Sequence, residues 1–183
     1  MPYLRCTQKL LKAIGERRAP HIEQMTPAIL GDWYANLLVI ARQKVLLFTN
    51  EPTLYSFAVL GVRTAALPSL ARVFVEHLTL NLTHEHIPLF VIDRLLAEYR
   101  ALGLAGTEHR SVVGSMNNLA ALLEHYVRDA GGPASCSLPK VNEQLNRIPH
   151  KPLSWRFAVE ALQERLCGAV SLPGRQSHRV FLN

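Results

Sequence analysis

The fold is decided by Trp33-Tyr34-Ala35-Asn36-Leu37-Leu38-Val39-Ile40, whose side chains alternate between two faces with a period of two. That period is typical of a β-strand. The short turn 41–44 leads into a return strand, 45–50, and a second turn, 51–53, leads into residues 54–60. These three segments predict an antiparallel meander over residues 33–60. Both faces of the meander are largely apolar, so we expect helices to cover both.

The flanking segments complete an α+β pattern. Residues 3–6 predict a short N-terminal strand, and a short helix follows, with Thr7 as its N-cap and Gly15 at its end. Helical periodicity then covers residues 65–82, 88–102, 111–129, 139–145 and 153–166. Residues 104–108 fit either a further strand or an extended link. The sequence therefore predicts a three-stranded antiparallel meander, plus the N-terminal strand, covered by a helical second half.

The length of 183 residues predicts a single α+β domain over residues 1–167, followed by a loosely held C-terminal tail, 168–183. Apolar residues make up 49% of the chain, which is enough for a sizeable core. The residues that we expect in the core are Trp33, Leu37, Leu47, Phe48, Phe57, Met116, Leu119 and Leu123.

Composition also bounds the location of the protein. No apolar run reaches about 18 residues, so no transmembrane helix is expected. The first residues lack the apolar segment of a secretory signal. The cysteines are three in number and far apart, which argues against a disulfide framework and fits a reducing compartment. We therefore expect a cytoplasmic protein that does not contact a membrane.

The net charge of +6 belongs to the two ends of the chain. Residues 1–20 carry five Lys or Arg against one Glu, and residues 131–183 carry seven against three. If the two ends meet in the fold, they form one basic patch able to bind nucleic acid. The residues of that patch would be Lys9, Lys12, Arg17, Arg18, Lys140, Arg147, Lys151 and Arg156. The other interpretation is that these charges are simply solvated, since the chain has no run of five Lys or Arg.

Several segments resemble a small bacterial family that is known as a domain of unknown function. They are Leu4-Arg5-Cys6-Thr7-Gln8-Lys9-Leu10-Leu11, Gly31-Asp32-Trp33-Tyr34-Ala35-Asn36-Leu37-Leu38, Leu46-Leu47-Phe48-Thr49-Asn50-Glu51-Pro52-Thr53-Leu54 and Arg110-Ser111-Val112-Val113-Gly114-Ser115-Met116-Asn117. Leu145-Asn146-Arg147-Ile148-Pro149 is similar as well. The resemblance covers about residues 3–153. It implies a prokaryotic, intracellular, single-domain protein, and it carries over no activity, cofactor or catalytic residue.

The strongest candidate for a binding site is the segment His109-Arg110-Ser111-Val112-Val113-Gly114-Ser115-Met116-Asn117-Asn118. It runs from a predicted strand end into the first turns of a predicted helix. The N–H groups of a first helical turn lack internal partners and carry partial positive charge, and an Arg beside them adds a full charge. We therefore predict an anion-binding site, with Arg110 and Asn118 lining a pocket. Its residues are Arg110, Ser111, Gly114, Ser115, Asn117 and Asn118.

A purely structural interpretation of the same residues stays open. Ser111 can be no more than an N-cap, Gly114 a close packing contact with the sheet, and the Asn side chains can bond a neighbouring loop. No phosphate-loop or dinucleotide-binding spacing is present, so no cofactor is predicted.

Histidine provides the candidate for catalysis. His109 precedes Arg110, and this pairing of an acid–base group with a phosphate-binding group suits a metal-independent ribonuclease. The His84-Glu85-His86 segment looks like a polar connector between helices, and no metal-binding spacing occurs, so no metal site is predicted.

Three functional hypotheses follow, and the sequence leaves open whether the protein is an enzyme. The leading one is a non-catalytic binding or interaction module with an anion or nucleic-acid site at the start of the 111–129 helix. The second is a small, toxin-like ribonuclease or nucleotide-acting enzyme that uses His109. The third is a structural or partner-binding protein without a ligand site, and a protein partner or a homo-oligomer is compatible with all three.

Overall fold

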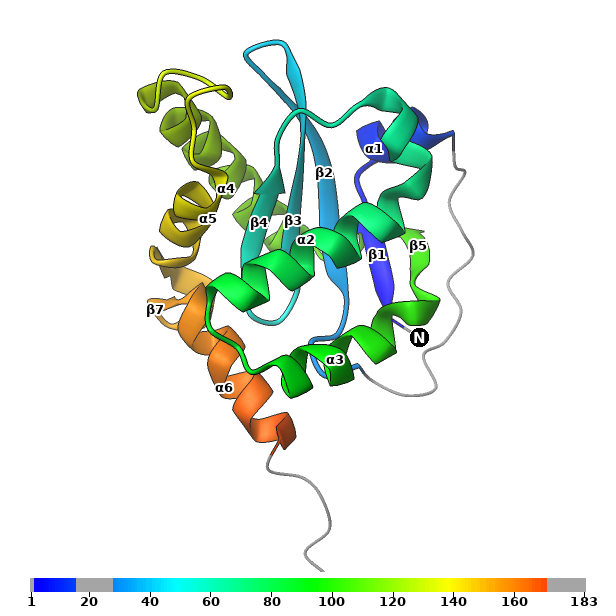
Figure 1. Cartoon of the computed structure of the whole chain (residues 1–183), viewed down its shortest axis with the longest axis vertical. Helices are drawn as coiled ribbons and strands as arrows, with labels where there is room; N and C mark the ends of the chain where they lie inside the picture. Colours follow the sequence, from blue (N-terminus) through cyan, green and yellow to red (C-terminus); the bar gives the residue numbers. More distant parts are fainter. Residues whose placement is uncertain (1, 16–27, 171–183) are drawn as a thin grey trace, which may run out of the picture.

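The computed structural model describes residues 2–15 and 28–170, which form an α+β fold around a mixed five-stranded sheet (Figure 1). The strand order is β4-β3-β2-β1-β5. The strands are β1 (Tyr3–Cys6), β2 (Trp33–Ile40), β3 (Gln43–Asn50), β4 (Ser56–Val59) and β5 (Gly103–Gly106).

The strands of residues 33–60 pair as the alternation predicts. Strand β2 pairs antiparallel with β3, from Trp33 opposite Asn50 to Ile40 opposite Gln43, and β3 pairs antiparallel with β4. The sheet is nevertheless larger than a meander with one added strand, because β1 lies parallel between β2 and β5. Strand β5 has only four residues, two of them Gly, and so short a segment carries too little periodicity to separate a strand from an extended link.

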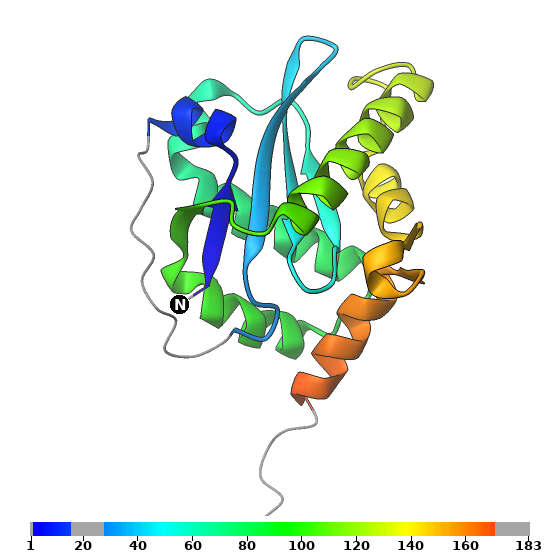
Figure 2. The ribbon, with the colours of Figure 1, turned by 180° about the vertical axis from the view of Figure 1, so that it is seen from behind.

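The helices lie in two layers. Helices α2 (Leu70–His84) and α3 (Leu89–Glu98) cover one face of the sheet, and α4 (Arg110–Asp129) and α5 (Leu138–Asn146) cover the other (Figures 1 and 2). The remaining helices are α1 (Gln8–Ile14), α6 (Ala158–Val170) and the 3₁₀ turns Thr64–Ser69, Tyr99–Ala101 and Lys151–Leu153. The sheet thus has apolar partners on both sides, as its composition predicts.

The C-terminal part differs from the prediction in two respects. The helix expected over residues 153–166 begins only at Ala158, because residues 149–157 form a small hairpin of β6 (Pro149–His150) and β7 (Arg156–Phe157). Residues 168–170, expected in the tail, belong to α6, whose apolar positions Leu162 and Leu166 keep it packed on the core. Residues 171–183 lie outside the described part of the chain.

The core consists of two apolar clusters, one on each face of the sheet. Strand β2 serves both, because Trp33 and Leu37 point to the α2/α3 side while Tyr34 and Ile40 point to the α4/α5 side. On the first side, the Trp33 indole donates a hydrogen bond to the Tyr99 hydroxyl. All eight residues predicted for the core are buried.

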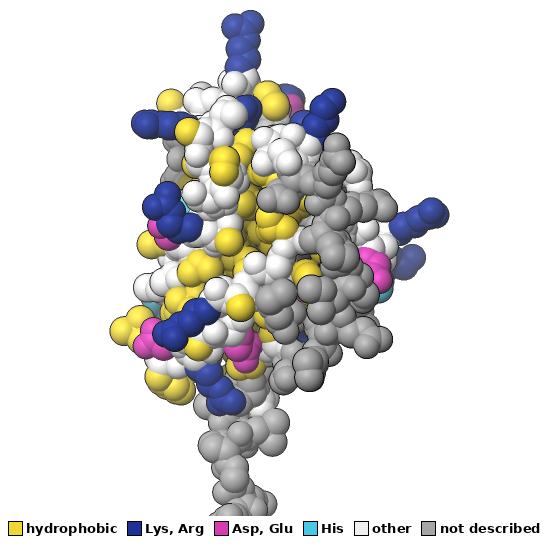
Figure 3. Space-filling model, turned by 90° about the vertical axis from the view of Figure 1, so that its right-hand side faces the viewer, with side chains coloured by type: hydrophobic (Ala, Val, Ile, Leu, Met, Phe, Trp, Pro, Cys, Tyr) yellow, Lys and Arg dark blue, Asp and Glu magenta, His cyan; other side chains and the backbone are white. Residues whose placement is uncertain are grey.

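The described basic residues of the two chain ends do not form one patch. Lys9 and Lys12 lie on α1, whereas Lys151 and Arg156 lie around β6 and β7, at the opposite end of the molecule (Figure 1). Figure 3 faces the β5 edge and shows Lys and Arg side chains scattered over this face, with no single large patch of them among the described residues. Arg17 and Arg18 fall outside the described residues. Among the residues described, the two ends therefore do not meet, so the condition for a single basic patch is not fulfilled there.

Within residues 2–15 and 28–170, none of the helices has both the length and the apolar character needed to cross a membrane.

Candidate functional site

Helix α4 begins at Arg110 without help from a side chain. His109 is its N-cap, with φ −87° and ψ 111°, and makes no side-chain capping bond to the helix. The first turn contains no acidic residue. Ser111 therefore lies inside the first turn, so that the capping role considered for it does not apply. The start of α4 retains the uncompensated partial positive charge of its amide groups.

The predicted site residues lie on the outer face of this helix. Arg110, Ser111, Gly114, Asn117 and Asn118 are exposed, and Ser115 is half-buried. Whether they line a pocket around a ligand stays a prediction.

Two observations argue against a packing role for these residues. A Cβ atom at Gly114 would meet none of the described residues within 4 Å, so this glycine is not needed for close contact with the sheet. Among the described residues, the side chains of Arg110, Asn117 and Asn118 make no hydrogen bond or ion pair. These side chains are therefore available to a ligand.

A cluster of charged and polar residues lies beneath the start of α4, and its centre is the buried Arg5 of β1. The Arg5 Nε donates to Asp32 Oδ2 at 2.7 Å, and its Nη1 lies 2.7 Å from Glu108 Oε2. Asp32 Oδ1 also accepts the Tyr3 backbone N–H. We call Arg5, Asp32, Tyr34, Glu51, Glu108 and His109 the Arg5 cluster.

His109 is held by two members of this cluster. Its Nε2 lies 3.1 Å from Glu51 Oε1, and its backbone N–H donates to the Tyr34 hydroxyl at 2.9 Å. The backbone N–H of Glu51 in turn donates to the Asp32 carbonyl at 3.0 Å. The backbones of Glu51 and His109 are thus both fixed by buried residues, whereas the imidazole is 54% exposed. This arrangement places a positioned, solvent-accessible acid–base group beside Arg110.

Burial shifts the pKa values of several residues of the Arg5 cluster. Desolvation raises the pKa of Glu51, and the neighbouring His109 only partly opposes this effect. Desolvation also raises the pKa of the Tyr34 hydroxyl, which therefore stays protonated at neutral pH. For Arg5, burial disfavours the charge, but the attraction of Asp32 and Glu108 outweighs it and holds the pKa above the ordinary value.

Sequence reasoning finds only His109 among the members of this cluster. Arg5 does carry a signal, because a charge at the centre of a four-residue strand that is otherwise apolar needs a buried partner. Asp32 and Glu51 stand at strand ends, where acidic residues are common in turns. Asp32 and Glu108 converge on Arg5, and Glu51 meets His109, only because β1 pairs in parallel with β2 and β5, which the sequence does not reveal.

Other candidate groups lie away from this site. His84 pairs with Glu143, and His125 pairs with Asp129 one turn further along α4. The described residues hold no group of three side chains arranged to bind a metal ion. Cys6 is buried, and desolvation raises the pKa of its thiol to about 12, so it is not a nucleophile at neutral pH.

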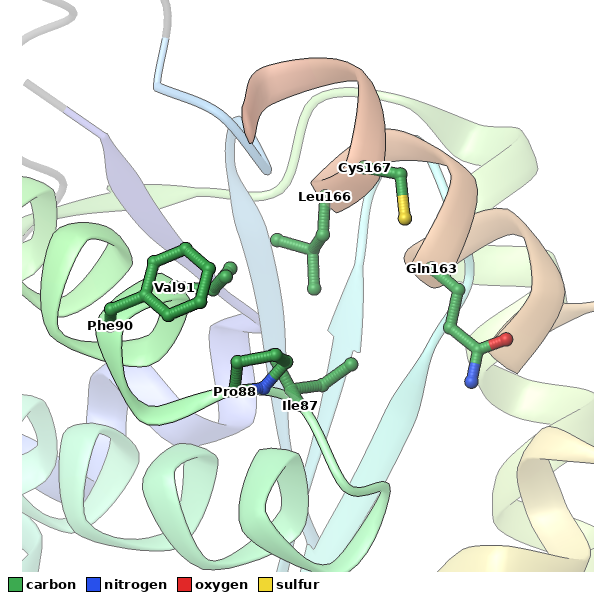
Figure 4. Close-up of a pocket in the computed structure, with 7 residues that line it drawn as sticks. All are labelled: Ile87, Pro88, Phe90, Val91, Gln163, Leu166 and Cys167. Carbon is green, nitrogen blue, oxygen red and sulfur yellow. The ribbon is translucent and has the colours of Figure 1, made fainter. Parts of the chain in front are cut away.

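A cavity of about 260 Å³ lies between the start of α3 and α6 (Figure 4). Leu166 of α6 points toward Pro88 and Val91 across it, and Ile87, Phe90, Gln163 and Cys167 complete the lining. None of these lining residues, all within the described part of the chain, is charged. This groove therefore offers apolar surface but no charge with which to hold an anion.

Comparison with known proteins identifies a family without a known function. No curated protein matches the chain. The family model that matches is described as Domain of unknown function (DUF6933), and the match spans residues 3–161. It includes the sheet, the start of α4 and every member of the Arg5 cluster. The chain therefore belongs to the DUF6933 family of domains of unknown function.

Proposed function

We propose that the protein is a binding module for a phosphate-bearing ligand, held at the start of α4. The ligand contacts are Arg110, Ser111, Gly114, Ser115, Asn117 and Asn118. The observation that carries this proposal is that the Arg110 guanidinium is exposed and unpaired among the described residues. Two nearby carboxylates are engaged, Glu108 with Arg5 and Glu51 with His109, whereas the exposed Arg110 has no partner among the described residues.

Three physical features favour an anion there. The first-turn amides of a long helix carry partial positive charge and have no internal partner. A guanidinium binds phosphate through two parallel hydrogen bonds. The small side chains on the exposed face leave room for a ligand to approach the backbone, as phosphates do at other helix starts.

Gly114 adds an argument from stability. Glycine inside a helix costs about 1 kcal/mol relative to alanine. No contact among the described residues requires this cost, since a Cβ at Gly114 would meet none of their atoms within 4 Å. A ligand lying against the helix would explain why a glycine stands there.

The test compares matched variants for binding and for stability. We expect the full chain to bind a fluorescent single-stranded RNA 12-mer, with inorganic phosphate as competitor, and affinity to fall with salt because phosphate contacts release counterions. Arg110→Ala should abolish binding and leave the melting temperature nearly unchanged. Arg128→Ala is the control, because Arg128 is an exposed arginine of the same helix, paired with Glu124 at its far end.

Gly114→Ala separates function from scaffolding. We expect this variant to melt at a higher temperature, because alanine favours the helix, and to bind RNA more weakly. Equal binding by the wild type, Arg110→Ala and Gly114→Ala would contradict the proposal. Binding of inorganic phosphate without RNA would restrict the ligand to small phosphates.

A further inference from the structure

We infer that His109, positioned by Glu51, is a catalytic acid–base residue that acts on RNA held by Arg110. This inference rests on the proposed function, since Arg110 must first hold the phosphate. It assigns to the Arg5 cluster a chemical role that anion binding alone does not require.

The geometry supplies the first argument. When Glu51 is ionised, its Oε1 accepts a hydrogen bond from His109 Nε2–H across the 3.1 Å contact. That bond selects the tautomer in which Nδ1 carries the lone pair, and Nδ1 is then the atom that takes a proton. A carboxylate bound to one imidazole nitrogen also stabilises the imidazolium that forms after proton transfer.

The rigidity of the pair supplies the second argument. The Tyr34 hydroxyl fixes the His109 backbone, and the Asp32 carbonyl fixes the Glu51 backbone. Glu108, the residue before His109, is tied to the buried Arg5. An exposed surface histidine needs none of these supports, whereas a catalytic group must be held within a fraction of an ångström of its working position.

RNA is the substrate class that suits a single general base next to a single cation, because its ribose 2′-hydroxyl serves as the nucleophile. His109 Nδ1 takes the proton of a ribose 2′-hydroxyl, and the 2′-oxygen forms a bond to the adjacent phosphorus. The bond from phosphorus to the 5′-oxygen breaks, and the proton passes from His109 to that oxygen. The products are a 2′,3′-cyclic phosphate and a 5′-hydroxyl, so the step balances without another reactant. Arg110 compensates the charge that develops on the phosphoryl oxygens.

The experiment uses the full chain with two labelled 12-mers of one sequence, RNA and its 2′-O-methyl analogue. The analogue can bind but has no nucleophile. We expect the wild type to bind both and to cleave only the RNA, leaving 2′,3′-cyclic phosphate ends. His109→Gln should lose cleavage by about 100-fold or more, the range of general acid–base catalysis, and still bind the analogue. Arg110→Ala should lose both binding and cleavage.

Glu51 is a positioning residue in this scheme, so its test needs a readout beyond a loss of rate. Glu51→Gln should lower the cleavage rate and shift its pH profile, because the charge beside the imidazole is gone, while analogue binding stays unchanged. Glu51→Asp should restore part of the rate.

The outcomes separate the two proposals. If the wild type binds RNA without cleaving it, or if His109→Gln cleaves as fast as the wild type, the catalytic inference is wrong and the binding function stands. If the wild type binds neither oligonucleotide nor inorganic phosphate, both proposals fail. The Arg128→Ala variant should cleave like the wild type, and the loss of cleavage in His109→Gln, purified in parallel, excludes a contaminating nuclease.

Discussion

The hydroxyl of Tyr34, a fully buried residue of β2, accepts the backbone N–H of His109 at 2.9 Å. The two residues are 75 positions apart in the chain. Their bond joins the central strand of the sheet to the N-cap residue of α4. The position of the candidate site is therefore determined by the core of the protein.

Removing this hydroxyl should loosen the start of α4. We expect Tyr34→Phe to lower the free energy of unfolding by about 1 kcal/mol, the usual net value of a hydrogen bond, as measured by urea denaturation. Tyr126→Phe is the control, because the Tyr126 hydroxyl makes no hydrogen bond within the described residues. An equal effect of the two changes would show that the Tyr34–His109 bond does not stabilise the fold.

The buried ion pair of Arg5 with Asp32 should be costly to break from either side. Asp32→Ala leaves the buried guanidinium of Arg5 without its buried counter-charge, and such changes cost about 3–5 kcal/mol. The double variant Arg5→Met, Asp32→Ala should lose less than the sum of the single changes, because it leaves no uncompensated arginine charge. Additive losses in a double-mutant cycle would mean that the two charges are not coupled.

Two asparagines of α5 pair with the edge of the sheet at β4. Asn146 Oδ1 accepts the Ser56 N–H and its Nδ2 donates to the Ser56 carbonyl, both at 2.7 Å. One turn earlier, Asn142 Oδ1 accepts the Ala58 N–H at 2.8 Å. These side chains take the place of a neighbouring strand and prevent pairing with another chain.

Asn146→Leu should therefore expose unpaired backbone groups. We expect a loss of about 1–3 kcal/mol for each buried group left without a partner, and an increase in aggregation on heating, followed by light scattering. Asn117→Leu is the matched change at an exposed position of α4. If the two variants were equally stable and equally soluble, the role assigned to α5 would be wrong.

His150 should make the protein less stable in mild acid. It is buried, its Nε2 has no hydrogen-bond partner among the described residues, and desolvation lowers its pKa. The unfolded chain, with an ordinary pKa of about 6.5, then binds a proton before the folded protein does. The contribution of neutral His150 to the free energy of unfolding is therefore fully present above about pH 6.5. It is lost as the pH falls below that value.

The measurement is the difference in unfolding free energy between pH 7.5 and pH 5 for the wild type and for His150→Phe. The variant should show the smaller decrease, because it has no imidazole to protonate. A decrease of the same size in both proteins would exclude His150 as a source of the acid sensitivity.

The parts of the fold that depend on local periodicity were predictable from the sequence. The strands of residues 33–60 and the apolar face of α4 follow from spacing alone, and the buried positions of Trp33 and Leu119 follow with them. The placement of β1 between β2 and β5 was not predictable, because parallel pairing joins segments distant in the chain and leaves no local pattern.

The same limit applies to the candidate site. The exposed polar face around Ser111 and Gly114 could be inferred from helical geometry. The pairing of His109 with Glu51 could not, because it requires the turn after β3 to meet the link after β5. Sequence patterns thus locate residues on one element, and only the tertiary structure brings together groups from several.

The most direct test of the proposed anion site is a phosphate titration of the ¹⁵N-labelled full chain, followed by two-dimensional NMR. Backbone amides of a first helical turn that bind an anion shift more than amides elsewhere. We expect saturable shifts confined to residues 110–118, with the largest at Ser111, and no shifts in the Arg110→Ala variant. Shifts that are absent from this segment, or that persist unchanged in Arg110→Ala, would contradict the proposal that α4 begins at a phosphate-binding site.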